Sequence, residues 1–131
     1  MPLEQIVFFL DRSLGSKIIA TLLREAGAAV QVHDDHFPQD TKDEIWLRSA
    51  GESGWVVLTK DERIRYRELE RRALMAAGVR AFVLTARNLS AAEMGQAFIG
   101  ALPPMQKLLA RHKGPFIANV TRGGRVKVIV E

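Results

Sequence analysis

Four short apolar runs alternate with segments of helical periodicity, and this alternation limits the fold more than any other feature of the chain. The runs are IVFFL at 6–10, AAVQVH at 28–33, WVVL at 55–58 and RAFVLT at 80–85. Each run has the length of a strand, and apolar residues at helical spacing follow each of them. Strands that alternate with helices predict a parallel sheet covered on both faces. We therefore expect an α/β protein with three layers (α/β/α) around a central, mainly parallel sheet of about four strands.

Capping patterns predict where the helices begin. Ser13 is a favoured N-cap for the first helix. The T-x-x-E pattern at 41–44 and the S-x-x-E pattern at 90–93 are capping boxes, which predict helices from the residues that follow. A long and highly charged helix is expected over 63–77, closed by Gly78.

The last part of the chain has a different pattern. Pro103 and Pro104 are expected to break or kink the helix that begins near residue 91. Two β-rich segments then flank Gly123 and Gly124, which predicts a C-terminal β-hairpin over about 115–131. No repeat, low-complexity segment or linker divides the chain, so we expect a single domain over residues 1–131.

Composition excludes several classes of protein. The 131 residues are 47% hydrophobic and 26% charged, as in ordinary soluble domains. No apolar run has the length of a membrane span, and the N-terminal residues do not resemble a signal peptide. The absence of cysteine excludes disulfides and thiolate metal sites and agrees with a reducing cytoplasm. A net charge of +4 permits a polyanionic partner such as RNA. We expect a cytoplasmic protein without membrane association.

Three aspartates are predicted to meet at one edge of the sheet. Asp11 directly follows the first strand, and Asp61 lies just past the third. Asp43 opens the helix before the third strand and shares the helix face of Trp46 and Ala50. In open α/β sheets ligands bind outside the carboxyl ends of the strands. The three side chains are therefore candidates for a common site.

Three converging carboxylates repel one another unless a cation neutralises them. Mg²⁺ and Mn²⁺ prefer such oxygen ligands, and one or two of these ions can activate water for phosphodiester hydrolysis. Each aspartate also has a structural alternative. Asp11 and Asp61 could be helix N-caps, and Asp43 could complement a helix dipole.

The segments FFLDRSLGSKIIATLLREAG and DTKDEIWLRSAGESGWVVLTKDERI resemble PIN-like domains, and in particular the compact group found among VapC-type toxins. The resemblance covers roughly residues 6 to 85. It implies a Mg²⁺- or Mn²⁺-dependent ribonuclease, which in many relatives is a toxin held inactive by a cognate antitoxin. Asp11, Asp43 and Asp61 match the family's acids. Its larger members carry one more acid, and Asp34, Asp35, Asp40 and Glu44 remain alternatives for it here.

Two other functions remain open. A catalytically silent PIN-like module that binds RNA or a protein is one alternative, which the absence of an obvious fourth acid favours. A phospho-acceptor receiver domain is another, although Asp11 and Arg12 do not supply the acid pair that such a domain needs.

Basic residues near the aspartates predict an RNA-binding surface. A strand of RNA that reaches the site would cross these residues, and Tyr66 could stack on an unpaired base. The alternative for the 60–72 run is a solvated helix face. The HDDHF segment at 33–37 is interpreted as a polar loop and not as a dedicated metal site. The expected partners are RNA, an antitoxin and a second copy of the chain, and the expected RNA contacts are Arg12, Lys17, Lys60, Arg63, Arg65 and Arg67.

Overall fold

A computed structural model describes residues 6–15 and 17–131, without the side chains of residues 65 and 66. The strands are β1 (Val7–Leu10), β2 (Ala29–Val32), β3 (Val56–Thr59), β4 (Arg80–Leu84), β5 (Phe116–Val120) and β6 (Val126–Val130). The helices are α1 (Ile18–Glu25), α2 (Asp43–Glu52), α3 (Arg63–Tyr66), α4 (Glu68–Ala76) and α5 (Ala91–Arg111), with single 3₁₀ turns at Arg12–Leu14 and His33–Asp35.

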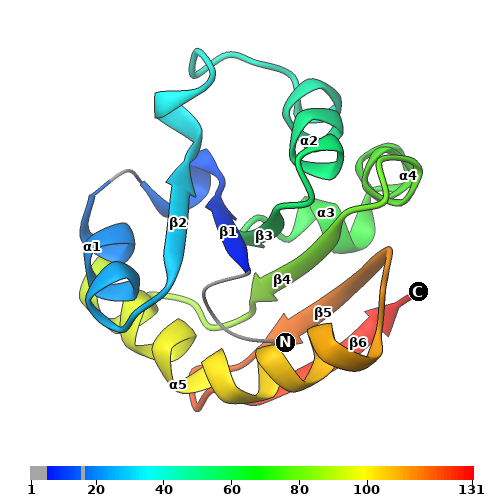
Figure 1. Cartoon of the computed structure of the whole chain (residues 1–131). Helices are drawn as coiled ribbons and strands as arrows, with labels where there is room; N and C mark the ends of the chain where they lie inside the picture. The colour runs from blue at the N-terminus through cyan, green and yellow to red at the C-terminus, as the bar shows by residue number, and fades with distance from the viewer. Residues whose placement is uncertain (1–5, 16) are drawn as a thin grey trace.

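The strands form one six-stranded sheet in the order β2-β1-β3-β4-β5-β6 (Figure 1). The first five strands are parallel, and β6 runs antiparallel to β5. The predicted parallel sheet and C-terminal hairpin are therefore confirmed. The first strand of the hairpin, β5, also pairs in parallel with β4, from Arg80 opposite Phe116 to Leu84 opposite Val120. The sheet therefore extends beyond the four strands expected.

Helices cover both faces of the sheet, which confirms the three-layer architecture (Figure 1). Alternate side chains of a strand point to opposite faces, so the adjacent residues Phe8 and Phe9 enter different cores. Phe8 belongs to the core beneath α1 and α5. Phe9 packs with Trp46 of α2 and Leu74 of α4. In the part of the chain that the structure describes, no helix combines the length and apolarity needed to cross a membrane.

The single helix predicted over 63–77 is wrong, because the chain forms α3 and α4 with Arg67 extended between them (ψ 125°). Ile64 and Leu74 are both buried in the same core. Ten residues at 3.6 residues per turn would place them about 80° apart on one continuous helix. The break at Arg67 lets both side chains reach the sheet.

Two predictions about α5 have different outcomes. The capping box is confirmed, since Ser90 Oγ accepts from Glu93 N at 3.1 Å and Glu93 Oε1 accepts from Ser90 N at 3.0 Å. Of the predicted break or kink at the prolines, the break is wrong, because α5 continues through Pro103 and Pro104. Ala101 and Met105 on either side of them are fully buried, and this packing favours the helical path although each proline costs about 3 kcal/mol in a helix interior.

Candidate active site

The direction in which the chain adds strands to the sheet reverses between β1 and β3. From β1 the chain passes through α1 to β2 on one side, whereas β3 lies on the other side of β1. Such a reversal of strand order is where open α/β sheets bind ligands. Asp11 directly follows β1, and Asp61 lies two residues after the end of β3. The carboxyl ends of these neighbouring strands therefore bring the two aspartates to one place.

Asp11 is a buried carboxylate held by hydroxyl groups. Its side chain accepts from Ser13 N at 3.0 Å, from Ser13 Oγ, and from Thr59 Oγ1 at 2.5 Å. Burial raises its pKa from 3.8 to about 6, and the charge of Asp61 adds to the rise, against the hydrogen bonds from Ser13 and Thr59. Asp11 thus also caps the 3₁₀ turn Arg12–Leu14. The prediction of Ser13 as the N-cap of the first helix is wrong, because its hydroxyl donates a hydrogen bond to the buried carboxylate of Asp11.

Thr59 connects the first aspartate to the second. This fully buried residue donates its hydroxyl to Asp11 Oδ2 and accepts from the backbone N–H of Asp61 at 3.0 Å. One side chain therefore sets the relative position of both acids. Burial favours a higher pKa for Asp61, but the hydrogen bonds and charge of Arg63 outweigh it and lower that pKa below its ordinary value. Asp61 Oδ1 also accepts from Arg63 N at 3.0 Å, although the N-cap of α3 is Glu62 and not Asp61.

Asp43 begins α2 and faces the same end of the sheet. Its Oδ1 accepts from Arg12 Nη2 and from the Trp46 indole N–H, both at 2.9 Å. The bond to Trp46 confirms that the two residues share a helix face. The capping box predicted at Thr41 and Glu44 is wrong, because Lys42 is the N-cap without a side-chain hydrogen bond. The Thr41 carbonyl instead accepts from Arg12 Nη1 at 2.5 Å, so one guanidinium holds the start of α2.

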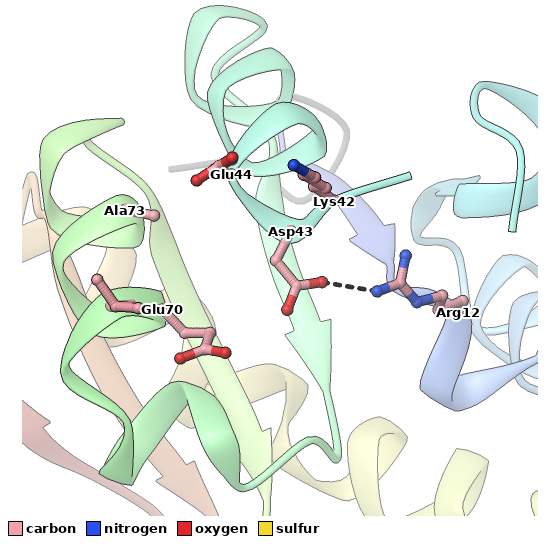
Figure 2. A pocket seen from close by; sticks show the side chains of 7 residues that line it. Arg12, Lys42, Asp43, Glu44, Glu70 and Ala73 are labelled. Atoms are coloured by element: carbon pink, nitrogen blue, oxygen red, sulfur yellow. Dashed lines mark hydrogen bonds and ion pairs between the residues drawn. The ribbon is translucent and has the colours of Figure 1, made fainter. Parts of the chain in front are cut away.

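Arg63 lies among three carboxylates. Its Nε is 3.0 Å from both oxygens of Asp61, and its Nη2 is 2.6 Å from Oδ2. These bonds raise the pKa of Arg63, and the charges of Asp43 and Glu70 contribute to the rise. Asp43 and Glu70 also line a common hollow with Arg12. Figure 2 shows Glu70 reaching from α4 toward the space in front of Asp43, while Glu44 points away from Arg12.

The donor set suits a hard divalent cation in kind, because carboxylate oxygens are the ligands that Mg²⁺ and Mn²⁺ prefer. In this structure, however, arginine guanidinium groups neutralise the charge of two of the carboxylates. Arg12 neutralises Asp43 and Arg63 neutralises Asp61. Among the described residues, no three His, Cys, Asp or Glu side chains are grouped closely enough to hold a metal ion. An ion at Asp61 would have to share or displace Arg63, which bonds to both oxygens of that carboxylate.

The basic residues predicted to bind RNA fall into two groups. Arg12 and Arg63 contact the aspartates directly, and Lys60 is exposed next to Asp61. Lys17 and Arg67 are exposed, the first at the N-cap of α1 and the second between α3 and α4, and neither forms an ion pair in the described part of the chain. The side chains of Arg65 and Tyr66 lie outside the described residues.

The acids of the 33–40 segment that remained alternatives for a fourth ligand are exposed. Asp34 accepts hydrogen bonds from Gln39 and, at 3.4 Å, from His33. Asp35 and Asp40 are exposed, with no ion pair in the described part of the chain. His33 is buried against Phe9, Phe37 and Trp46, and its Nε2 lacks a hydrogen-bond partner within the described residues.

Sequence reasoning missed Thr59, Ser13 and Glu70 as members of the site. The T-x-D pattern that contains Thr59 was a usable signal, because a hydroxyl two residues before an aspartate can accept from its backbone. Glu70 had no such signal, since its position depends on the break at Arg67.

Comparison with known proteins agrees with this geometry. A family model described as "PIN like domain" matches residues 6–86. The Mycobacterium tuberculosis protein named "Putative ribonuclease VapC45" is 32% identical over 125 residues, which cover 92% of this chain and 90% of that protein. No solved structure matches the chain. The chain therefore belongs to the PIN-like domain family.

Proposed function

We propose that this protein is a cytoplasmic, metal-dependent endoribonuclease that hydrolyses RNA phosphodiester bonds, with Mg²⁺ or Mn²⁺ held by Asp11, Asp43 and Asp61. One observation carries the proposal. The buried carboxylate of Asp11 and the Asp61 backbone share the hydroxyl of Thr59 at the carboxyl ends of β1 and β3. Asp43 and its partner Arg12 flank this position. The name of the relative in Mycobacterium tuberculosis supports the same activity.

The residues of the chain have distinct roles in this proposal. Ser13 and Thr59 hold the Asp11 carboxylate in one orientation, so the ligand is preorganised. When bound, a divalent ion supplies an activated water and stabilises the charge that develops on the phosphate. Arg12 and Arg63, which neutralise Asp43 and Asp61 in its absence, then have their charge available for the phosphates of RNA.

Lys60 completes the proposed RNA surface. It is exposed and adjoins Asp61, and the described residues place no carboxylate within ion-pair distance of it. Lys17 and Arg67 are more peripheral candidates. Phosphate contacts of this kind predict that RNA binding weakens as salt rises.

We also propose that the ribonuclease is the toxin of a toxin–antitoxin pair. The hollow between α2 and α4 holds Asp43 and Glu70 and carries the exposed Leu69 on its edge. A basic side chain of an antitoxin could enter between these acids while apolar residues cover Leu69. Co-purification of the chain with the product of a neighbouring small reading frame, lost in Leu69→Asp, tests this part separately.

A catalytically silent PIN-like module that binds RNA or a protein is the second candidate. The observation that favours it is the compensation of Asp43 by Arg12 and of Asp61 by Arg63. Two of the three acids are then neutralised without a metal ion.

Calorimetric titration with MnCl₂ and a cleavage assay on labelled RNA distinguish the two candidates. The ribonuclease should bind Mn²⁺ and lose both binding and cleavage in Asp11→Asn, Asp43→Asn and Asp61→Asn. Asp40→Asn is the matched control, because its side chain is exposed and does not line the hollow of Asp43 and Glu70, and Glu44→Gln tests the neighbouring acid of α2 that lines this hollow. RNA binding without Mn²⁺ binding or cleavage in the wild type would establish the silent module. Loss of cleavage in Glu44→Gln but not in Asp43→Asn would show that the acid of α2 is wrongly assigned.

A further inference from the structure

A second hollow opens at the same edge of the sheet, beside Asp61 but on the side of β4. It lies past the end of β4 and has a volume of about 270 Å³. Sites for drug-sized ligands commonly span ~300–1,000 Å³. This hollow, the β4 hollow below, is therefore suited to one small ring system.

The inner wall of the β4 hollow is apolar. Leu84 and Met94 are buried members of the core between the sheet and α5, and Ala86 and Leu89 pack partly buried against the same core. Leu84 at the end of β4 and Met94 in α5 are fixed in this core, and Ala86 and Leu89 belong to the segment that joins the two elements. Aliphatic surfaces of this kind can accept the flat face of an unpaired base.

The rim of the β4 hollow carries two polar side chains with no ion pair in the described part of the chain. Asn88 is exposed and has a left-handed backbone (φ 60°), which few side chains adopt and Asn tolerates best. Its amide offers both donors and an acceptor, the combination that matches the edge of a base. The second side chain is Lys60, which immediately precedes Asp61.

Charge at this edge favours a phosphate beside Lys60. Arg63 neutralises Asp61, and Arg87 neutralises Glu62 through bonds of 3.0 to 3.3 Å. The Arg87–Glu62 pair also ties the segment after β4 to the segment after β3, so the two sides of the β4 hollow are joined. Lys60 then remains as a positive charge between the hollow and the candidate active site.

We propose that the β4 hollow binds one unpaired nucleobase of the RNA, next to the phosphate that reaches Asp61. Asn88 reads the edge of this base, and Lys60 contacts the adjoining phosphate. This base-binding site makes the enzyme selective for the nucleotide beside the cleaved bond. The inference rests on the proposed RNA function, and it adds the position at which sequence is read.

The test uses labelled five-residue RNA strands that are abasic except for a central A, C, G or U, and one fully abasic strand. Fluorescence anisotropy is measured with the full chain in EDTA, where cleavage cannot occur. The wild type should bind at least one central base about tenfold more tightly than the abasic strand, as stacking and a paired edge predict. Asn88→Gly keeps the left-handed backbone without the amide, and it should reduce the preference among bases to less than twofold.

Two further variants separate the base from the phosphate. Ala86→Phe fills the β4 hollow and should lower the affinity for every strand to that for the abasic strand. The control is Ala26→Phe, which changes an exposed alanine at the end of α1 and should leave these affinities unchanged. Lys60→Ala should weaken all strands equally, the abasic one included, and lower the salt slope by about 1. Circular dichroism checks that the variants are folded. If Ala86→Phe is unfolded, the base preference of Asn88→Gly alone decides whether the β4 hollow binds the base.

The outcomes distinguish this inference from the function on which it rests. RNA binding whose base preference is unchanged in Asn88→Gly and Ala86→Phe would overturn the β4 hollow as the reading site and leave the ribonuclease intact. No binding of any strand by the wild type would overturn both.

Discussion

Replacing Asp11 by Asn is expected to stabilise the metal-free protein at neutral pH, although it removes a proposed metal ligand. Asp11 is 3% exposed, and its pKa is raised from 3.8 to about 6, first by burial and further by the charge of Asp61. The ionised carboxylate is thus less stable in the folded protein than in the unfolded chain. Asn cannot ionise and avoids that cost.

The sign and size of the effect follow from proton linkage. Because its pKa is higher when folded, Asp11 favours the folded state below pH 3.8, and this contribution is lost as pH rises through about 6. A rise of about two pKa units corresponds to ~3 kcal/mol above that range. The Asn amide would have to donate to Thr59 Oγ1, which already accepts from Asp61 N, so part of the gain is lost. We expect Asp11→Asn to raise the unfolding free energy at pH 8 by ~1–3 kcal/mol.

Urea denaturation of both proteins in EDTA, from pH 4 to pH 8, measures this difference. It should be largest at pH 8 and approach zero toward pH 4, while Asp40→Asn, which changes an exposed acid, should follow the wild type throughout. Mn²⁺ at about 100 times its dissociation constant should stabilise the wild type by ~2.7 kcal/mol and leave Asp11→Asn unchanged. A variant that is less stable at pH 8, or a difference independent of pH, would refute the reasoning.

Three further perturbations test other parts of the structure. Thr59→Val removes the hydroxyl shared by Asp11 and Asp61, so urea denaturation should show a loss of ~1–3 kcal/mol in the free energy of unfolding. NMR titration should show a further rise in the pKa of Asp11. The control Thr21→Val, which changes an exposed threonine, should show neither effect. Ser90→Ala removes the capping box of α5 and should lower stability by about 1 kcal/mol without changing RNA cleavage; an equal loss of cleavage would contradict a purely structural role. Gly124→Ala should lower the melting temperature, because Gly124 has φ +82° and an added Cβ would lie 2.9 Å from the Gly100 backbone. Gly123→Ala should melt like the wild type, because the nearest neighbour of its Cβ would be 3.9 Å away.

The sequence alone determined the strands, the layers and the positions of the three aspartates. Strand and helix periodicities are local, and in a parallel sheet the residues that follow strands must lie at the carboxyl edge. Asp11 and Asp61 were therefore predictable from their places after apolar runs, and Asp43 from its spacing to Trp46, whose indole N–H it accepts. The strands and aspartates that carried the resemblance lie within residues 6–86, the region that matches the family model.

Only the tertiary structure decided which groups surround these aspartates. The break at Arg67, which brings both Ile64 and Leu74 to the sheet, also places Glu70 beside Arg63, and no local propensity indicated it. Capping was likewise decided by distant contacts. The Ser13 hydroxyl bonds to buried Asp11 instead of a helix end, because an unsatisfied buried carboxylate costs more than an uncapped exposed helix. Burial against segments far away in the chain thus determines the charge and partners of each acid, while local pattern determines only where each acid lies.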